Sequence, residues 1–293
     1  MRVRVLGSAA GGGFPQWNCR CETCEAARAG ERARPRTQSS LAIRGDDGPW
    51  FLVNASPDLR EQLESLGAEG AGGVRAAPVA GVLLTDAEID HTAGLLLLRE
   101  AAAPMPIWGA AGVERALTEG YPVLPMLERY CGVEWRTLEP ERQQPLAGSS
   151  LVVEPFAAGG DAPRYFDGEL EASGFVFTDG DRTLTYVPGL ARLDGGVLAR
   201  LAASDLVLVD GTFWHDDDLA RQGISDRTAR DMGHTPLAGP GGTLEVLAAL
   251  ERPRKVLVHI NNTNPILLED SAERAEVVRA GVEVAYDGLE VEL

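Results

Sequence analysis

Positive charge is scarce in this chain of 293 residues. Lysine and arginine together number 27 against 44 aspartate and glutamate residues, so the formal net charge is -17 and the pI is near 4.7. Binding to a phosphate backbone requires clustered basic side chains. The composition therefore argues against nucleic acid as a substrate or partner.

Long hydrophobic runs are also missing. No stretch of 18 apolar residues occurs, which argues against a membrane-spanning helix. The first residues, MRVRVLGSAAGGG, lack the apolar core of a signal peptide and predict a strand that runs into a glycine-rich loop. We therefore expect a cytoplasmic protein with no membrane partner.

Cysteine is rare, and its spacing is informative. Four cysteines in a cytosolic chain of this length argue against a disulfide framework, because that compartment keeps thiols reduced. Three of them form the motif Cys-x-Cys-x-x-Cys at Cys19, Cys21 and Cys24, which can bring three sulfur ligands to one zinc ion. We predict a structural zinc loop at residues 19–24 whose fourth ligand comes from elsewhere.

Hydrophobic patterning predicts an α/β fold in which strands alternate with helices. Apolar strands are expected in the segments LAIRGDDGPWFLV, SLVVEPFAA, ASGFVFTDG, RTLTYVPG, DLVLVDGTFW and RKVLVHINN. Helices are expected up to Leu66, from Asp90 through the run HTAGLLLLREAAA, and over residues 243–250. Residues 68–78, rich in glycine and alanine, are expected to form a loop or insertion. No composition break divides the chain, so residues 1–293 are predicted to form a single domain.

The segment TDAEIDHTAG contains three acids and a histidine directly after a buried strand. Asp86, Glu88, Asp90 and His91 lie on a strand-to-helix turn, where their side chains could converge on one point. Such a cluster requires a cation, because unpaired buried charge is costly. The alternative is that the acids cap the helix that follows. We favour metal binding because one acid is enough for a cap.

Only four histidines occur, and two further ones follow predicted strands or turns. His259 ends the apolar segment KVLVH, a position where α/β proteins gather ligands. His234, in the segment DMGHTP, is a candidate acid-base group or a helix cap. His215 is flanked by a run of acids and is expected to be solvated.

These features resemble the metallo-β-lactamase fold: an acidic turn with histidine after a buried strand, the segment DGTF, the segment GHT and a final strand ending in histidine. The chain is similar over nearly its full length to the coenzyme pyrroloquinoline quinone (PQQ) biosynthesis protein B family. The similarity lies in the segments GSAAGGGFPQWNCRCETC, RTQSSLAI, NASPDLR, TDAEIDHTAGL, YVPGL and VHINNTNPIL. The resemblance implies a four-layer αββα sandwich with its site at one edge.

The chain departs from the ligand set of that superfamily. Two histidines of the first metal motif are replaced by Asp86 and Glu88, and the third-motif histidine has no counterpart near Gly159 and Gly160. Pro188 and Gly189 stand where the bridging aspartate is expected. The loss of these ligands argues against a two-metal hydrolytic centre.

The remaining ligands suit a single hard metal ion. His91, His259 and one carboxylate give a two-histidine, one-carboxylate set of the kind used by non-haem iron(II) oxygenases. Asp90 is the first choice for that carboxylate and Asp210 the second. Asp86 and Glu88 would complete or orient the ligand shell. The expected cofactor is Fe(II) or another divalent metal.

The resemblance implies a role in PQQ biosynthesis. The expected reaction is an O2-using, iron-dependent hydroxylation of the tyrosine ring in a PQQ precursor derived from Glu-Tyr, with His234 and Asp210 as catalytic residues. The expected partners are this small-molecule or dipeptide precursor, O2 and other proteins of the PQQ pathway. A cysteine motif like that of residues 19–24 helps to form the dimer interface in some relatives, which implies a homodimer.

Two alternatives remain open at this point. The chain could be a metal-dependent hydrolase of the metallo-β-lactamase type, or a carrier involved in transport of PQQ or its precursor to the periplasm. PQQ and its precursor are anionic, so a protein that binds either compound would need a pocket that contains arginine. Arg36, Arg60 and Arg164 are its candidate members.

Overall fold

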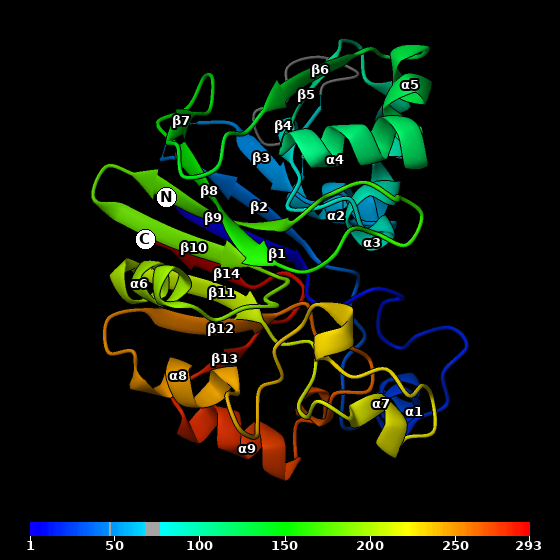
Figure 1. Cartoon of the computed structure of the whole chain (residues 1–293), viewed down its shortest axis with the longest axis vertical. Helices are drawn as coiled ribbons and strands as arrows, with labels where there is room; N and C mark the ends of the chain where they lie inside the picture. The colour runs from blue at the N-terminus through cyan, green and yellow to red at the C-terminus, as the bar shows by residue number, and fades with distance from the viewer. Residues whose placement is uncertain (47, 68–76) are drawn as a thin grey trace.

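The computed structural model describes residues 1–46, 48–67 and 77–293, and the part of the predicted loop at residues 68–76 lies outside this range. Two seven-stranded sheets form the centre of the molecule (Figure 1). The first sheet has the order β14 (Glu290–Glu292), β1 (Arg2–Gly7), β2 (Ser40–Arg44), β3 (Trp50–Val53), β4 (Val79–Leu83), β5 (Met105–Gly109) and β6 (Val133–Thr137). The second has the order β13 (Glu283–Val284), β12 (Arg254–Val258), β11 (Leu206–Asp210), β10 (Arg182–Val187), β9 (Ala172–Asp179), β8 (Val152–Gly159) and β7 (Gln144–Pro145).

Helices cover the outer faces of the sheets. The α-helices are α1 (Glu22–Ala29), α2 (Leu59–Leu66), α3 (Ile89–Thr92), α4 (Ala111–Arg115), α5 (Val123–Glu128), α6 (Gly195–Ala203), α7 (Asp218–Arg221), α8 (Thr243–Ala249) and α9 (Ala272–Arg279). Short 3₁₀ or π segments are η1 (Ala93–Glu100), η2 (Ala116–Gly120), η3 (Arg230–Met232) and η4 (Pro265–Leu267). Within the described ranges, no helix is both long and apolar enough to cross a membrane.

Alternation along the strands explains the layers. In β11, Leu206 and Leu208 face the other sheet, whereas Val207 and Val209 pack against the cluster that contains α6, α8 and α9. The first sheet likewise buries Leu52 against α2, η1 and α5 on its outer face. Because successive side chains of a strand point to opposite faces, each sheet has an apolar surface on both sides. The result is the predicted four-layer αββα sandwich.

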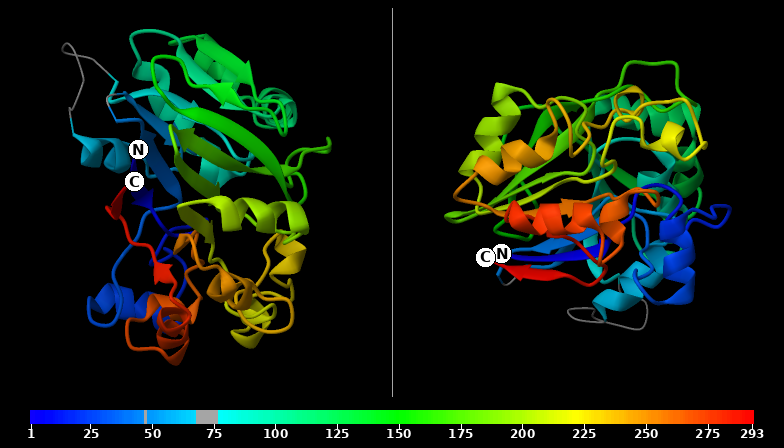
Figure 2. Two further views of the ribbon diagram at one scale, coloured as in Figure 1. Left: turned by 90° about the vertical axis from the view of Figure 1, so that its left-hand side faces the viewer. Right: turned by 90° about the horizontal axis from the view of Figure 1, so that it is seen from below.

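Strand pairing joins distant parts of the chain. β1 pairs with β14 and β2, so the first and last strands lie side by side (Figure 2). β3, β4 and β5 run parallel to one another, as do β10, β11 and β12. Parallel strands place their carboxyl ends at one edge, where α/β proteins bind ligands. A backbone hydrogen bond of 2.8 Å from Ser173 N to Thr85 O connects the two sheets near this edge.

Most predicted elements are present, with two differences. The helix predicted to begin near Asp90 does begin at Ile89, but after Thr92 it continues as the 3₁₀ segment η1. The predicted zinc loop at residues 19–24 is partly helical, because Cys24 lies in the first turn of α1, where it is buried. The apolar side of α1 faces the core beneath the second sheet.

Candidate metal centre

Two histidines and one aspartate meet where the two sheets end. Asp90 and His91 belong to α3 after β4, and His259 directly follows β12. One ligand atom from each of the three lies within 4.8 Å of the others, a spacing that can hold a metal ion. Asp90 Oδ2 is 3.4 Å from His259 Nε2 and 3.9 Å from His91 Nε2. These are the residues that the sequence ranked first as ligands.

His91 is held in the orientation that a ligand needs. Its Nδ1 lies 2.7 Å from Asp86 Oδ2 and 2.8 Å from Oδ1, whereas its Nε2 is buried without a hydrogen-bond partner among the described residues. Buried polar atoms are normally paired, and metal-binding histidines typically donate their other ring N–H to a carboxylate. The unpaired Nε2 therefore fits a metal ion.

The charge state of His91 without metal follows from its neighbours. Burial alone would lower its pKa, but the carboxylates of Asp86 and Asp90 outweigh burial and raise the pKa to about 9. Burial would likewise raise the pKa of Asp90, yet His91 and His259 hold it below its usual range. In the metal-free protein a proton on His91 takes the place of the cation.

The four candidate ligands of the TDAEIDH turn do not all face one point. Asp86 contacts the opposite nitrogen of the His91 ring and also accepts bonds from Glu88 N at 2.9 Å and Thr85 Oγ1 at 2.7 Å. Asp86 therefore orients His91, which is the second of the two roles predicted for it. Glu88 lies in the cavity outside the ligand group. Loss of hydration and the nearby Asp86 and Asp90 raise the pKa of Glu88 to about 7.

Asp210 forms a second acid-histidine pair. His234 Nδ1 lies 2.7 Å from Asp210 Oδ2, which also accepts from Leu190 N at 2.9 Å. The other oxygen, Oδ1, accepts from Thr212 N at 2.9 Å and from Thr212 Oγ1 at 2.5 Å. Although the ligand atoms of Asp210, His234 and His259 also lie within 4.8 Å of one another, these four bonds use the lone pairs of Asp210. The geometry disfavours Asp210 as a ligand and pairs it with His234 instead.

Thr212 connects His259 to the Asp210–His234 pair, and no sequence motif singled it out. Its Oγ1 is 2.8 Å from His259 Nδ1 and 3.2 Å from His234 Nδ1. If Thr212 donates to Asp210, it accepts from His259 Nδ1–H, which leaves His259 Nε2 free to face Asp90. His259 has a φ of 54°, an uncommon conformation for a residue other than glycine. The only sequence signal for Thr212 was its place in the DGTF segment.

A cavity of about 510 Å³ opens onto this cluster, and we call it the histidine cavity. It is lined by His91, His234, His259 and Asp90 together with glycines from several connectors: Gly11, Gly159, Gly160, Gly189 and Gly233. The positions where the superfamily pattern predicts a third-motif histidine and a bridging aspartate therefore lie on the cavity wall without a ligand side chain. A Cβ at Gly189 would lie 4.0 Å from His234 Cε1.

Of the three arginines considered for an anion pocket, Arg164 lines the histidine cavity. Arg36 is buried elsewhere and donates to Ala285 O, and Arg60 lies on the exposed side of α2. Arg227 also lines the cavity and was missed, because the loop before η3 gives no local sequence signal. His215 contacts Trp214 and lies outside the cavity.

The cysteine motif forms a separate group. One atom each from Cys19, Cys21 and Cys24 lies within 4.8 Å of the others, as a shared zinc would require. Within the part of the chain that the structure describes, no histidine or acid joins them in this group. The Nδ2 atom of Asn262 lies 3.3 Å from Cys24 Sγ, so the segment after β12 reaches both His259 and the cysteines. Burial raises the pKa of Cys24 to about 11 in the metal-free protein.

The chain is similar to known proteins over its full length. Residues 49–260 match the family model described as "Beta-lactamase superfamily domain". The chain is 47% identical to "Coenzyme PQQ synthesis protein B" of Cupriavidus necator, with 99% of both chains covered, and 46% identical to the protein of that name from Methylococcus capsulatus, with full coverage.

Solved structures agree with this assignment. The crystal structure of Zn(2+)-bound PqqB from Methylobacterium extorquens superposes with a TM-score of 0.92 at 40% identity and covers both chains completely. A diphosphatase from the PhnP family, at 20% identity and a TM-score of 0.72, shares the fold alone. The chain therefore belongs to the coenzyme PQQ synthesis protein B family of the beta-lactamase superfamily.

Proposed function

We propose that this protein acts in PQQ biosynthesis as an iron-dependent oxygenase that hydroxylates the tyrosine ring of a precursor derived from Glu-Tyr. Family membership supports the pathway, and the relative from Methylobacterium extorquens, described as Zn(2+)-bound, supports a divalent metal. The reaction class rests on the ligand set. We infer it from the side chains around the unpaired His91 Nε2.

The unpaired, buried Nε2 of His91 carries the proposal. Together with His259 and Asp90 it gives two imidazoles and one carboxylate. This set with open positions is typical of non-haem Fe(II) oxygenases, and a bound iron ion would supply the activation of dioxygen. A two-metal hydrolytic centre is disfavoured, because glycines occupy the wall where its further ligands are expected.

The overall reaction replaces one ring C–H by C–OH. One oxygen atom of O2 enters the ring and the other leaves as water, so two electrons and two protons must come from an added reductant and solvent. We assign to His234 the role of holding or transferring a proton at the phenol, because Asp210 fixes its Nδ1 and the ring lines the cavity. Asp210 raises the pKa of His234 against the effect of burial, which keeps a proton available.

The test is an anaerobic reconstitution. The protein is loaded with iron(II) or with zinc(II), mixed with Glu-Tyr dipeptide and ascorbate, and then exposed to O2. We expect product with the added mass of one oxygen atom from the iron-loaded protein, and labelled oxygen in that product when ¹⁸O2 is used. Product from the zinc-loaded protein, with none from the iron-loaded protein, would refute oxygenase chemistry.

The cysteine group is proposed to hold a structural zinc that is independent of this reaction. Metal analysis should then find one zinc per chain in the Asp90→Ala variant, in which the histidine cavity has lost its carboxylate ligand. Loss of all metal from that variant would contradict two separate sites.

A further inference from the structure

The mouth of the histidine cavity contains two arginines, although the chain is strongly acidic. Arg164 lies on the connector between β8 and β9, and Arg227 lies on the loop between α7 and η3. Arg164 makes no hydrogen bond or ion pair with any described residue. The guanidinium of Arg227 donates only from Nη2, to Asp231 O at 2.5 Å, while its backbone N donates to Ser225 Oγ at 3.2 Å, so the other guanidinium donors are unused. Most arginines elsewhere on the surface pair with acids, so these two are unusual.

The two arginine-bearing connectors are fixed and touch each other. On one side, Tyr165 donates through its hydroxyl to Ala87 O, and its ring packs against Tyr121 with centroids 6.0 Å apart. The connectors meet at two glycines, because a Cβ at Gly233 would lie 3.5 Å from Gly160 Cα. On the other side, Thr228 N donates to Asp231 Oδ2 at 2.9 Å and Asp231 N donates to Thr228 Oγ1 at 3.1 Å, so the backbone near each arginine is anchored.

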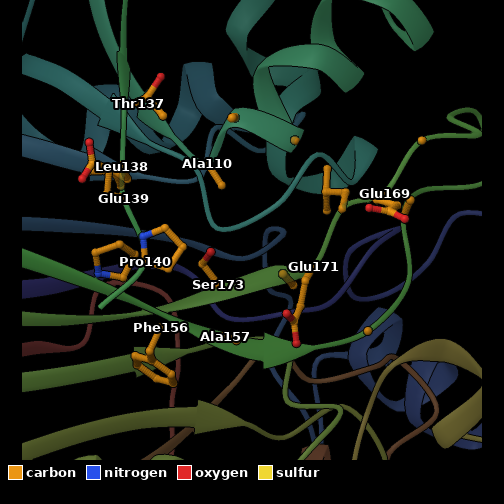
Figure 3. A pocket seen from close by; sticks show the side chains of 18 of the residues that line it. Ala110, Thr137, Leu138, Glu139, Pro140, Phe156, Ala157, Glu169, Glu171 and Ser173 are labelled. Atoms are coloured by element: carbon orange, nitrogen blue, oxygen red, sulfur yellow. The ribbon is translucent and has the colours of Figure 1, made fainter. Parts of the chain in front are cut away.

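A neighbouring cavity of about 840 Å³ has the opposite character (Figure 3), and we call it the acidic cavity. It shares part of its wall with the histidine cavity, at residues 160–162, Leu170 and Ala172. Glu139, Glu169 and Glu171 line it, and no basic side chain is found among the described residues of its lining. An anionic ligand is therefore directed to the arginine side of the shared wall.

Five acids also line the histidine cavity, and three of them are engaged, whereas the side chains of Glu88 and Asp161 have no hydrogen bond among the described residues. Asp86 and Asp90 face histidines, and Asp231 Oδ2 accepts from Thr228 N at 2.9 Å. A divalent metal at the centre would add two positive charges. The cations left for a ligand are therefore the metal and the two guanidinium groups, whose planar donors match carboxylates.

We propose that Arg164 and Arg227 bind the carboxylates of the substrate and hold its aromatic ring toward His91 and His234. The inference rests on the proposed function and makes it specific: the substrate is a free, dipeptide-sized compound that carries at least two carboxylates. A volume of about 510 Å³ falls within the usual range for sites of small ligands. The two arginines select the substrate and take no part in the chemistry.

Binding without turnover tests this proposal. Under nitrogen, calorimetry on the zinc-loaded protein would compare Glu-Tyr with the same dipeptide amidated at both carboxyl groups. We expect the Arg164→Ala and Arg227→Ala variants each to weaken Glu-Tyr binding roughly 10- to 100-fold, as loss of a charge-assisted hydrogen bond does. The diamide should bind equally weakly to all variants. Arg129→Ala, an exposed arginine outside the cavity, is the matched control.

Two results would overturn the proposal: unchanged Glu-Tyr affinity in both variants, or wild-type protein that binds acid and diamide alike. In turnover assays the variants should raise KM and leave kcat within about twofold, whereas a distorted site would lower kcat. Arginine-dependent binding without any oxygenation in the iron-loaded protein would leave this inference standing and refute the proposed reaction. The two failures are thus distinguishable.

Discussion

The two halves of the molecule use the same arrangement of three residues for different ends. In the first half, Asp86 pairs with His91 Nδ1 and accepts from the Thr85 hydroxyl; in the second, Asp210 pairs with His234 Nδ1 and accepts from the Thr212 hydroxyl. Both acid-imidazole distances are 2.7 Å. The difference lies in the other ring nitrogen. His91 is 3% exposed and turns an unpaired Nε2 to the ligand group, whereas His234 is 16% exposed and lines the cavity.

The comparison shows that the acid-histidine pair alone does not determine function. A buried carboxylate fixes the ring and its tautomer in both halves. The role then follows from the surroundings of each ring: His91 Nε2 lies 3.9 Å from Asp90 Oδ2, whereas the His234 ring stacks on His259 and lines the cavity. We therefore expect substitutions in the Asp86–His91 pair to change metal affinity and substitutions in the Asp210–His234 pair to change the chemical step.

The largest effect is expected from removing a ligand. His91→Ala and His259→Ala should each lose iron from the centre and all oxygenation activity. Removing a ligand should lower iron affinity by more than the roughly 10- to 100-fold that follows from removing a residue that only hydrogen-bonds a ligand. Metal content after anaerobic purification, measured by mass spectrometry of the elements, checks this. Full iron occupancy in either variant would remove His91 and His259 from the ligand set.

Next in size is His234→Ala. Iron content should stay at the wild-type level while kcat falls roughly 10²- to 10⁴-fold, the usual contribution of an acid-base group. Steady-state kinetics at saturating dipeptide, with iron measured on the same sample, separates the two. Loss of iron would make His234 a ligand and would end the contrast between the two halves.

Substitutions of Asp86 and Asp210, the acids that hold the two histidines, should likewise separate metal affinity from kcat. Asp86→Asn should weaken iron affinity about 10- to 100-fold and leave kcat of the saturated protein nearly unchanged. Asp210→Asn should leave iron affinity unchanged and lower kcat. Competition with a chromophoric chelator measures affinity, and near-UV circular dichroism confirms that both variants fold. Equal effects of the two substitutions on affinity would contradict the proposed division.

The smallest effect concerns pH and stability of the metal-free protein. Because Asp86 and Asp90 raise the pKa of His91 from 6.5 to about 9, its protonated form stabilises the fold below pH 6.5, and that contribution is lost as pH rises through 9. Glu88, with a pKa near 7, acts in the same direction between about pH 4.5 and 7. The melting temperature should therefore fall between pH 6.5 and 9, by about 2 to 4 °C for each kcal/mol lost from the free energy of unfolding.

Metal should abolish this pH dependence, since it replaces the proton on His91. His91→Gln should flatten the metal-free profile above pH 7, whereas His215→Gln, outside the cavity, should not alter it. An apo protein whose melting temperature rises between pH 6.5 and 9 would show that the charge balance around His91 has been assigned the wrong sign.

Local patterns predicted much of the fold and the first half of the site. Strand alternation gave the sheets, and the five-residue spacing from Asp86 to His91 is short enough for the sequence to identify that cluster. The cysteine group was predictable for the same reason. The resemblance, in contrast, was needed to associate Asp210 with His234, which are 24 residues apart.

What the sequence could not predict depends on long-range contacts. Nothing local distinguishes Asp86, which holds the His91 ring, from Asp90, which faces the ligand group. Thr212 acquires its position only because β11 and β12 pair in parallel and bring it to His259. Arg227 lines the cavity because its loop folds back across the strand ends, an event that depends on tertiary packing.

The glycines of the histidine cavity mean that its shape is set largely by main chain. Gly159, Gly160 and Gly233 have positive φ, so a larger residue there would strain the backbone. Gly189 has no positive φ and has open space beside it, which makes it a place where one methyl group can be added at little cost. Engineers who wish to narrow the substrate range of this cavity can therefore begin at Gly189 and leave every polar group in place.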